Sequence, residues 1–146
     1  MKVKDILTKK GSQVLTIGKN TTVLEAISIF STNRVGSLLV VDKEDGILGI
    51  IAARDVLMTV VNNLDNIKEI KVDKIMTTEL IVATEDDDID YIQAIMTENR
   101  IRHVPVLDGK ELKGIVSIGD VVKLLLKAKD VENRYLHDYI ADKYPG

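Results

Sequence analysis

The sequence predicts an α/β protein of two tandem strand–helix–strand–strand–helix (β-α-β-β-α) repeats, followed by a C-terminal helix. The first observation is an internal duplication: Arg34 and Arg100 lie 66 positions apart, and Asp55 and Asp120 lie 65 apart. The second is an alternation of short apolar runs with segments of helical period. We expect the repeats at residues 1–66 and 67–130, and the helical tail at 131–146.

The composition limits the class of protein. An apolar content of 45% with 3% aromatic residues indicates an aliphatic core, which the two halves are expected to share because each is small. The absence of cysteine excludes disulfides and a cysteine nucleophile, and the net charge of −3 argues against a nucleic-acid partner. Without a signal peptide or an apolar stretch of membrane length, we expect a cytoplasmic protein with no membrane partner.

The first repeat opens with an apolar leader and a polar turn over residues 1–13, followed by a strand at 14–17. Thr22 and Glu25 have the spacing of a capping box, which predicts that a helix begins there. The continuous apolar run at 37–41 predicts a buried strand. The remaining elements are a partner strand at 47–51 and a helix with Val56, Leu57, Val60, Val61 and Leu64 at helical spacing.

The second repeat follows a polar link at residues 65–71 and has the same order of elements. Pro105 falls within a predicted strand, where its missing N–H confines it to an edge or a bulge. The predicted elements are a strand at 80–82, a helix from Asp88, strands at 103–107 and 112–116, and a helix from Ser117.

The tail carries Val131, Leu136 and Ile140 as an apolar stripe on a predicted helix. The stripe has two explanations. It covers the protein's own core or a dimer interface, or it contacts a partner protein.

Two stretches, Gly49–Asp55 and Gly114–Asp120, each predict a strand that runs through a glycine and restarts at once as a helix. In the second copy, Ser117 and Asp120 fall in the first helical turn, where free backbone N–H groups and the positive end of the helix dipole suit a phosphorylated sugar. Taken singly, these two residues are better explained as a helix cap and a favourable first-turn charge than as ligand contacts.

The duplicated motif Gly-Ile-(Ile/Val)-x-x-x-Asp and the run at residues 99–108 resemble a pair of cystathionine-β-synthase-type (CBS) domains, over residues 1 to about 128. The resemblance implies a pseudo-two-fold Bateman module, with the sheets of both repeats packed together and two related clefts. Such modules are regulatory and not catalytic, often form homodimers, and commonly bind AMP, ADP, ATP, NAD(H) or S-adenosylmethionine.

The family motif places a hydroxyl residue between its glycine and its aspartate. Gly114, Ser117 and Asp120 match it in full, which implies Asp120 as a ribose ligand and Ser117 as a ribose or phosphate ligand. In the first copy, Ala52 replaces the hydroxyl residue while Asp55 remains, so that cleft is expected to bind weakly or differently.

The resemblance implies further contacts, with alternatives that stay open. Arg102 and His103 occupy a place where the family often carries basic residues toward phosphates, but a surface ion pair and a histidine satisfied by backbone explain them as well. Arg54 could stack on a base or pair with phosphate, and it is equally explained as a solvated surface arginine. Adenine is expected against the first strand of each repeat, at Thr16, Ile17, Val82 and Ala83.

These expectations combine into a free-standing regulatory module that binds an adenosine-containing ligand and modulates an unidentified partner in trans. AMP, ADP, ATP and NAD(H) are favoured over S-adenosylmethionine, and a homodimer is expected. No P-loop, nucleophile elbow or other catalytic motif occurs, so we expect no enzyme activity, no metal and no required cofactor. The alternative function is a dimeric interaction scaffold that binds no ligand.

Overall fold

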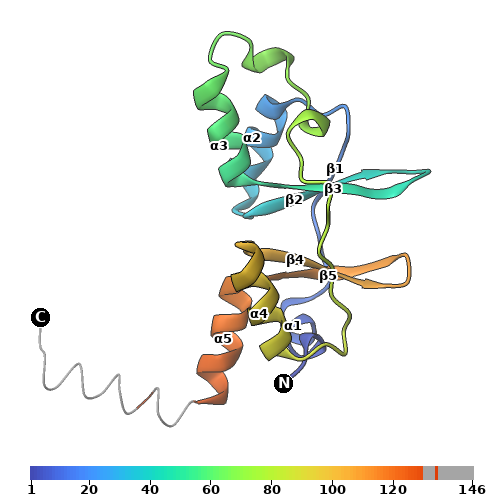
Figure 1. The fold of residues 1–146 in the computed structure, drawn as a ribbon, viewed down its shortest axis with the longest axis vertical. Coiled ribbons are helices and arrows are strands. Elements are labelled where there is room, and N and C mark those ends of the chain that lie inside the picture. The colour runs from blue at the N-terminus through green and yellow to red at the C-terminus, as the bar shows by residue number, and fades with distance from the viewer. Residues whose placement is uncertain (130–133, 135–146) are drawn as a thin grey trace, which may run out of the picture.

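The computed structural model describes residues 1–129 and Arg134. The chain forms two lobes stacked along the long axis of the molecule (Figure 1). The long helices of both lobes lie on one side of the sheets, and the two strand hairpins point to the other side. The predicted α/β class with tandem repeats is therefore confirmed, whereas the predicted tail helix at 131–146 lies outside the described residues except for Arg134.

The first lobe is a three-stranded sheet in the order β1-β2-β3, with β1 parallel and β3 antiparallel to β2. The predicted capping box is present, because the backbone N–H of Glu25 donates to Thr22 Oγ1 over 3.1 Å. The elements of this lobe are β1 (Thr16–Gly18), α2 (Val23–Asn33), β2 (Ser37–Asp42), β3 (Gly46–Ala52) and α3 (Ala53–Asn62).

The second lobe contains a two-stranded antiparallel sheet. The predicted strand at residues 80–82 is wrong, because these residues form no strand and only Ala83, directly after them, makes a single bridge to Val106. The elements after α3 are the short 3-10 helices η1 (Ile67–Glu69) and η2 (Val72–Lys74), then α4 (Ile89–Asn99), β4 (His103–Asp108), β5 (Glu111–Ser117) and α5 (Ile118–Ala128).

Pro105 explains why this strand does not form. In the first lobe, the N–H of Leu39 donates to the carbonyl of Leu15 and extends the pairing of β1 with β2. Pro105 stands 66 positions after Leu39 and has no N–H to donate. The pairing that remains is carried by Ala83, which donates to the carbonyl of Pro105 and accepts from Leu107, each over 2.9 Å.

Residues 1–13 also differ from the prediction of a leader and a turn, because they contain an eight-residue helix, α1 (Val3–Lys10). Val3, Ile6 and Leu7 recur at helical spacing and are all buried. This apolar face stabilises a helix that would be too short to persist alone in water.

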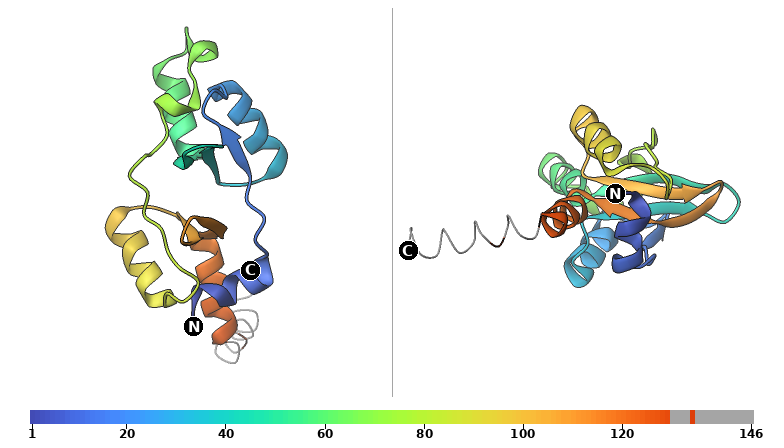
Figure 2. Two further views of the ribbon diagram at one scale, coloured as in Figure 1. Left: turned by 90° about the vertical axis from the view of Figure 1, so that its right-hand side faces the viewer. Right: turned by 90° about the horizontal axis from the view of Figure 1, so that it is seen from below.

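The core forms two clusters, and each takes residues from both halves of the sequence. Val3, Ile6 and Leu7 of α1 pack in the second lobe, whereas Val72 packs in the first. Figure 2 shows the two connecting segments that run between the lobes. The halves therefore share their cores by exchanging short segments.

The motif glycines allow these exchanged segments to approach the hairpins closely. A Cβ added at Gly49 would lie 2.7 Å from the carbonyl oxygen of Thr77, and one at Gly114 would lie 2.7 Å from a methyl carbon of Leu7. Both distances are too short for a side chain. The glycines thus have a packing role in this fold.

Candidate functional site

A cavity of about 490 Å³ lies between the lobes, within the size range of small-molecule sites. It brings together four of the residues predicted from the sequence, namely Arg54, Asp55, Arg102 and His103. The full lining is Gly36, Ile50, Ala52, Ala53, Arg54, Asp55, Thr77, Arg100, Ile101, Arg102 and His103. We call this cavity the inter-lobe cleft.

Two kinds of element place charge in the inter-lobe cleft. Arg54 and Asp55 belong to the first turn of α3, directly after β3. Arg100 and Arg102 belong to the connection between α4 and β4, where Arg100 ends the helix in the left-handed region with φ of 54°. After this turn, the second lobe contributes both Arg100 and Arg102 to the lining of the cleft.

The charge of the inter-lobe cleft is positive, because three arginines accompany the single carboxylate of Asp55. Oδ2 of Asp55 accepts a hydrogen bond from the N–H of Ala52 over 3.0 Å. Asp55 forms no ion pair with any residue among those the structure describes. Guanidinium groups in such a site bind phosphate oxygens through charge-assisted hydrogen bonds.

Ala52 leaves the start of α3 open. In the second repeat, the hydroxyl of Ser117 accepts from the N–H of Asp120 over 3.1 Å. Ala52 has no hydroxyl, so the N–H of Asp55 lacks the corresponding partner. A backbone N–H in the first turn of a helix is a suitable donor to an anionic ligand.

His103 is a half-buried strand residue rather than a cation. Burial lowers its pKa, and the charges of Lys10 and Arg102 lower it further against the opposing effect of Asp120. The ring is therefore neutral near pH 7. It also packs against Gly36, where an added Cβ would lie 2.7 Å from Nε2.

Ser117 and Asp120 do not line the inter-lobe cleft, and both already have partners within the protein. The N–H of Ser117 donates to Asp120 Oδ2 over 2.9 Å, and Lys10 Nζ donates to the same oxygen over 2.7 Å. Lys10 also reaches the carbonyl of Ile115 over 2.8 Å. Burial alone would raise the pKa of Asp120, but these bonds outweigh it and hold the pKa below its ordinary value.

The residues predicted to contact adenine lie outside the inter-lobe cleft. Ile17 and Ala83 are buried in the two core clusters, whereas Thr16 is exposed and the exposed fraction of Val82 is 40%. Gly114 packs against Leu7. Binding of adenine by Thr16, Ile17, Val82 and Ala83 stays a prediction.

Sequence reasoning did not assign Arg100, Thr77 or Lys10 to a site. Arg100 carries a signal, since it follows the end of a helix and matches Arg34 in the repeat. Lys10 carries none, because its contact with Asp120 joins residues that are 110 positions apart.

Two further observations concern the part of the chain that is described. No helix there is long and apolar enough to cross a membrane. No group of three or more His, Cys, Asp or Glu side chains there could hold a metal ion.

The comparisons with known proteins agree with the duplicated architecture. The family model "CBS domain" matches twice, at residues 3–62 and 68–127. The CBS domain-containing protein CBSX3, mitochondrial, of Arabidopsis thaliana is 34% identical over 150 residues, covering 97% of this chain and 73% of that protein.

Two solved structures are similar. The CBS-domain containing protein ATU1752 from Agrobacterium tumefaciens has a TM-score of 0.81 and 35% identity, with 85% of this chain and 98% of that chain covered. The CBS domain pair of protein MJ0100, in complex with 5-methylthioadenosine and S-adenosyl-L-methionine, has a TM-score of 0.75 and 29% identity, with 86% and 99% covered. This chain therefore belongs to the CBS-domain family, and its two lobes form a CBS domain pair.

Proposed function

We propose that this protein is a regulatory module whose inter-lobe cleft binds an adenosine-containing ligand and which modulates a partner protein in trans, in the cytoplasm. The observation that carries the proposal is the combination in one cavity of about 490 Å³ of a first-turn carboxylate, Asp55, with the guanidinium groups of Arg54, Arg100 and Arg102. No catalytic role and no required cofactor are part of the proposal.

Each part of a nucleotide has a counterpart in the cleft. The carboxylate of Asp55 accepts hydrogen bonds from the two ribose hydroxyls, and the arginines bind phosphate. Ile50 and Ile101 provide the apolar surface against which a base can lie.

The charge of the cleft favours one class of adenosine ligand. The MJ0100 domain pair is in complex with 5-methylthioadenosine and S-adenosyl-L-methionine, which supports adenosine as the common group. S-adenosylmethionine carries a positive sulfonium, which three arginines repel. We therefore expect AMP, ADP, ATP or NAD(H) to bind more tightly than S-adenosylmethionine.

Regulation follows from the position of the cleft. Its lining residues come from both lobes, for example Asp55 from α3 and Arg102 from the segment before β4. A ligand that fits one relative arrangement of the lobes better than another shifts the population toward that arrangement. A partner that contacts both lobes would respond to this shift.

A homodimer is part of the proposal and rests on exposed apolar side chains. Leu57 and Val61 of α3 are 62% and 61% exposed, and Val122 and Leu126 of α5 are 47% and 48% exposed. These residues occupy the same positions in the two repeats, on helices that lie on one side of the molecule (Figure 1). A repeated apolar face of this kind is suited to pairing with a second copy.

Replacing Leu57 and Val122 with lysine is expected to convert a dimer into a monomer, because the charges would be buried between the two copies. Sedimentation equilibrium measures the mass, and Lys19→Glu serves as a control on an exposed loop. A wild type that is monomeric, or a double variant that stays dimeric, would contradict this interface.

Ligand binding is tested by thermal shift with AMP, ADP, ATP, NAD, NADH and S-adenosylmethionine. A ligand present at 100 times its dissociation constant should add about 2.7 kcal/mol of stability. We expect Arg100→Gln to weaken the apparent affinity for the ligand about tenfold or more, since it removes a charge-assisted hydrogen bond. The thermal shift at a fixed ligand concentration should fall accordingly. Arg34→Gln is the matched control, because Arg34 has the same exposed, left-handed position in the first repeat and does not line the cleft.

The ligand-free scaffold is the second candidate function, and the exposed apolar faces of α3 and α5 are the observation that favours it. The same experiment separates the two. Protein shown to be free of carried-over nucleotide that responds to none of the six ligands, yet remains dimeric, would favour the scaffold.

A further inference from the structure

A second, smaller cavity of about 310 Å³ lies between α1 and α5 in the second lobe. We call it the α1–α5 groove. It shares no lining residue with the inter-lobe cleft. Its lining is Asp5, Ile6, Lys9, Lys10, Asp120, Lys123, Leu124 and Lys127.

The lysines of the α1–α5 groove outnumber its carboxylates. Lys10 is engaged by Asp120 over 2.7 Å, and Asp5 accepts a hydrogen bond from the backbone N–H of Lys2 over 2.8 Å. Among the residues that the structure describes, Lys9, Lys123 and Lys127 form no ion pair. With four lysines and two carboxylates, the groove keeps an excess of positive charge.

Two of these lysines, Lys9 and Lys127, line the groove from different helices. Lys127 lowers the pKa of Lys9, chiefly through a side-chain interaction, while the charge of Asp5 opposes this effect. Two neighbouring ammonium groups repel each other unless an anion lies between them. An anion bound between Lys9 and Lys127 would relieve this repulsion.

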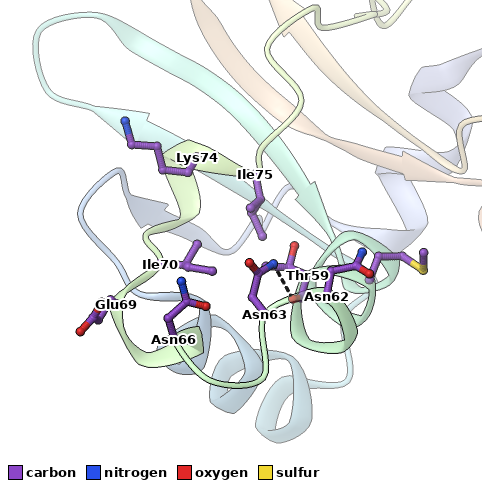
Figure 3. A pocket seen from close by; sticks show the side chains of 9 residues that line it. Thr59, Asn62, Asn63, Asn66, Glu69, Ile70, Lys74 and Ile75 are labelled. Atoms are coloured by element: carbon purple, nitrogen blue, oxygen red, sulfur yellow. Dashed lines mark hydrogen bonds between the residues drawn. The ribbon is translucent and has the colours of Figure 1, made fainter.

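The first lobe supplies an internal control, because it has a cavity of about 530 Å³ at the corresponding place (Figure 3). Figure 3 shows Thr59, Asn62 and Asn63 on one side of this cavity, with Ile75 and Lys74 opposite. By the 65-residue offset of the repeat, Met58 corresponds to Lys123 and Asn62 to Lys127.

Comparing the two cavities shows which lysines of the α1–α5 groove the packing of the fold requires. Lys9 corresponds to Thr78 by the offset of 69 that relates Val3 to Val72. The groove of the first lobe thus forms with methionine and asparagine at the positions of Lys123 and Lys127, whereas Thr78 does not line it and Lys74 stands at the position of Asp5. Packing therefore does not require Lys123 or Lys127, and Lys9 and Lys127 each lie in the last turn of a helix, where a cation is favoured.

We propose that the α1–α5 groove binds a small anion of the phosphate class that carries at least two negative charges, such as a diphosphate group. Each ammonium group donates up to three hydrogen bonds, and phosphate oxygens are strong acceptors. The volume of the groove suits one or two phosphate groups rather than a folded partner. The proposal goes beyond nucleotide binding in the inter-lobe cleft and does not depend on it.

The test is calorimetric titration of the full chain with inorganic diphosphate. The wild type is compared with Lys9→Thr/Lys127→Asn, which installs the side chains of the other lobe, and with Lys19→Thr/Lys43→Asn, which removes the same charge from exposed loops. We expect the groove variant to bind at least tenfold more weakly and the loop variant to bind within about twofold of the wild type. Affinity should fall with added salt.

Circular dichroism melting shows whether the groove variant is folded, which we expect because Lys9 and Lys127 are both exposed. Equal losses in the two variants would mean general charge attraction and would overturn the proposal, as would a wild type that binds no diphosphate and no phosphate-bearing vesicle. Retention on phosphatidic-acid vesicles that the groove variant loses would assign the phosphate to a lipid headgroup, whereas diphosphate binding without retention would assign it to a soluble anion.

Discussion

Replacing Leu7 with alanine is expected to lower the free energy of unfolding by about 2–5 kcal/mol, the usual cost of emptying a buried leucine site. Leu7 is 8% exposed and belongs to the core cluster of the second lobe, although it stands near the start of the sequence. Chemical denaturation measures the size of the loss. Hydrogen exchange locates it, and we expect protection to fall in α4, β4, β5 and α5.

Met76→Ala is the matched control, because Met76 is the repeat counterpart of Leu7 and packs against the core cluster of the first lobe. Its effect on hydrogen exchange is expected in α2, α3 and the β1–β3 sheet. If Leu7→Ala instead exposed the amides of the first lobe, the exchange of segments between the halves would be refuted.

Asp120→Ala is expected to cost about 1–3 kcal/mol, because it leaves the N–H of Ser117 without a partner and removes the ion pair of Lys10. The side chain of Asp120 is only 16% exposed and accepts both bonds. Asp55→Ala should cost less, since Asp55 accepts only from Ala52 and has no lysine partner among the described residues. Urea denaturation of the two variants measures the difference.

The contribution of Asp120 should depend on pH. Its pKa is lower in the folded protein than in the unfolded chain, so its stabilisation is fully present above the unfolded pKa. The stabilisation is lost as the pH falls through the lowered, folded value. The difference between wild type and Asp120→Ala should therefore shrink in acid, and a difference that stays constant with pH would contradict this ion pair.

The elements that the sequence predicted well have their signals within a few residues. The helix α2 begins at a capping box, and β2 is a continuous apolar run between a helix end and a turn. The duplication strengthened the prediction of these elements, because each sequence signal occurs in both repeats. Local chemistry and repetition together were sufficient for most of the fold.

The elements that differed depend on distant residues. α1 is stabilised by burying Val3, Ile6 and Leu7 in a core that lies in the other half of the sequence. The expected strand at residues 80–82 fails because Pro105, far along the chain, cannot donate to it. Neither effect can be read from a local window.

The candidate site shows the same limit. The motif analysis favoured the second copy, which has the full Gly114, Ser117 and Asp120 set. The inter-lobe cleft lies at the first copy, while Lys10 engages Asp120, and ligand binding by Ser117 and Asp120 stays a prediction. The motif identifies Asp55 and Asp120 as equivalent carboxylates. It does not show that Lys10, on a separate helix, pairs with Asp120 and not with Asp55.

The most direct test of ligand binding in the inter-lobe cleft is a titration with AMP followed in ¹H–¹⁵N correlation spectra. The proposed site predicts that the shifted amides cluster at Ala52–Asp55, Thr77 and Arg100–His103. Saturating shifts confined to Lys10, Ser117 and Asp120, or no saturating shifts at all, would contradict it.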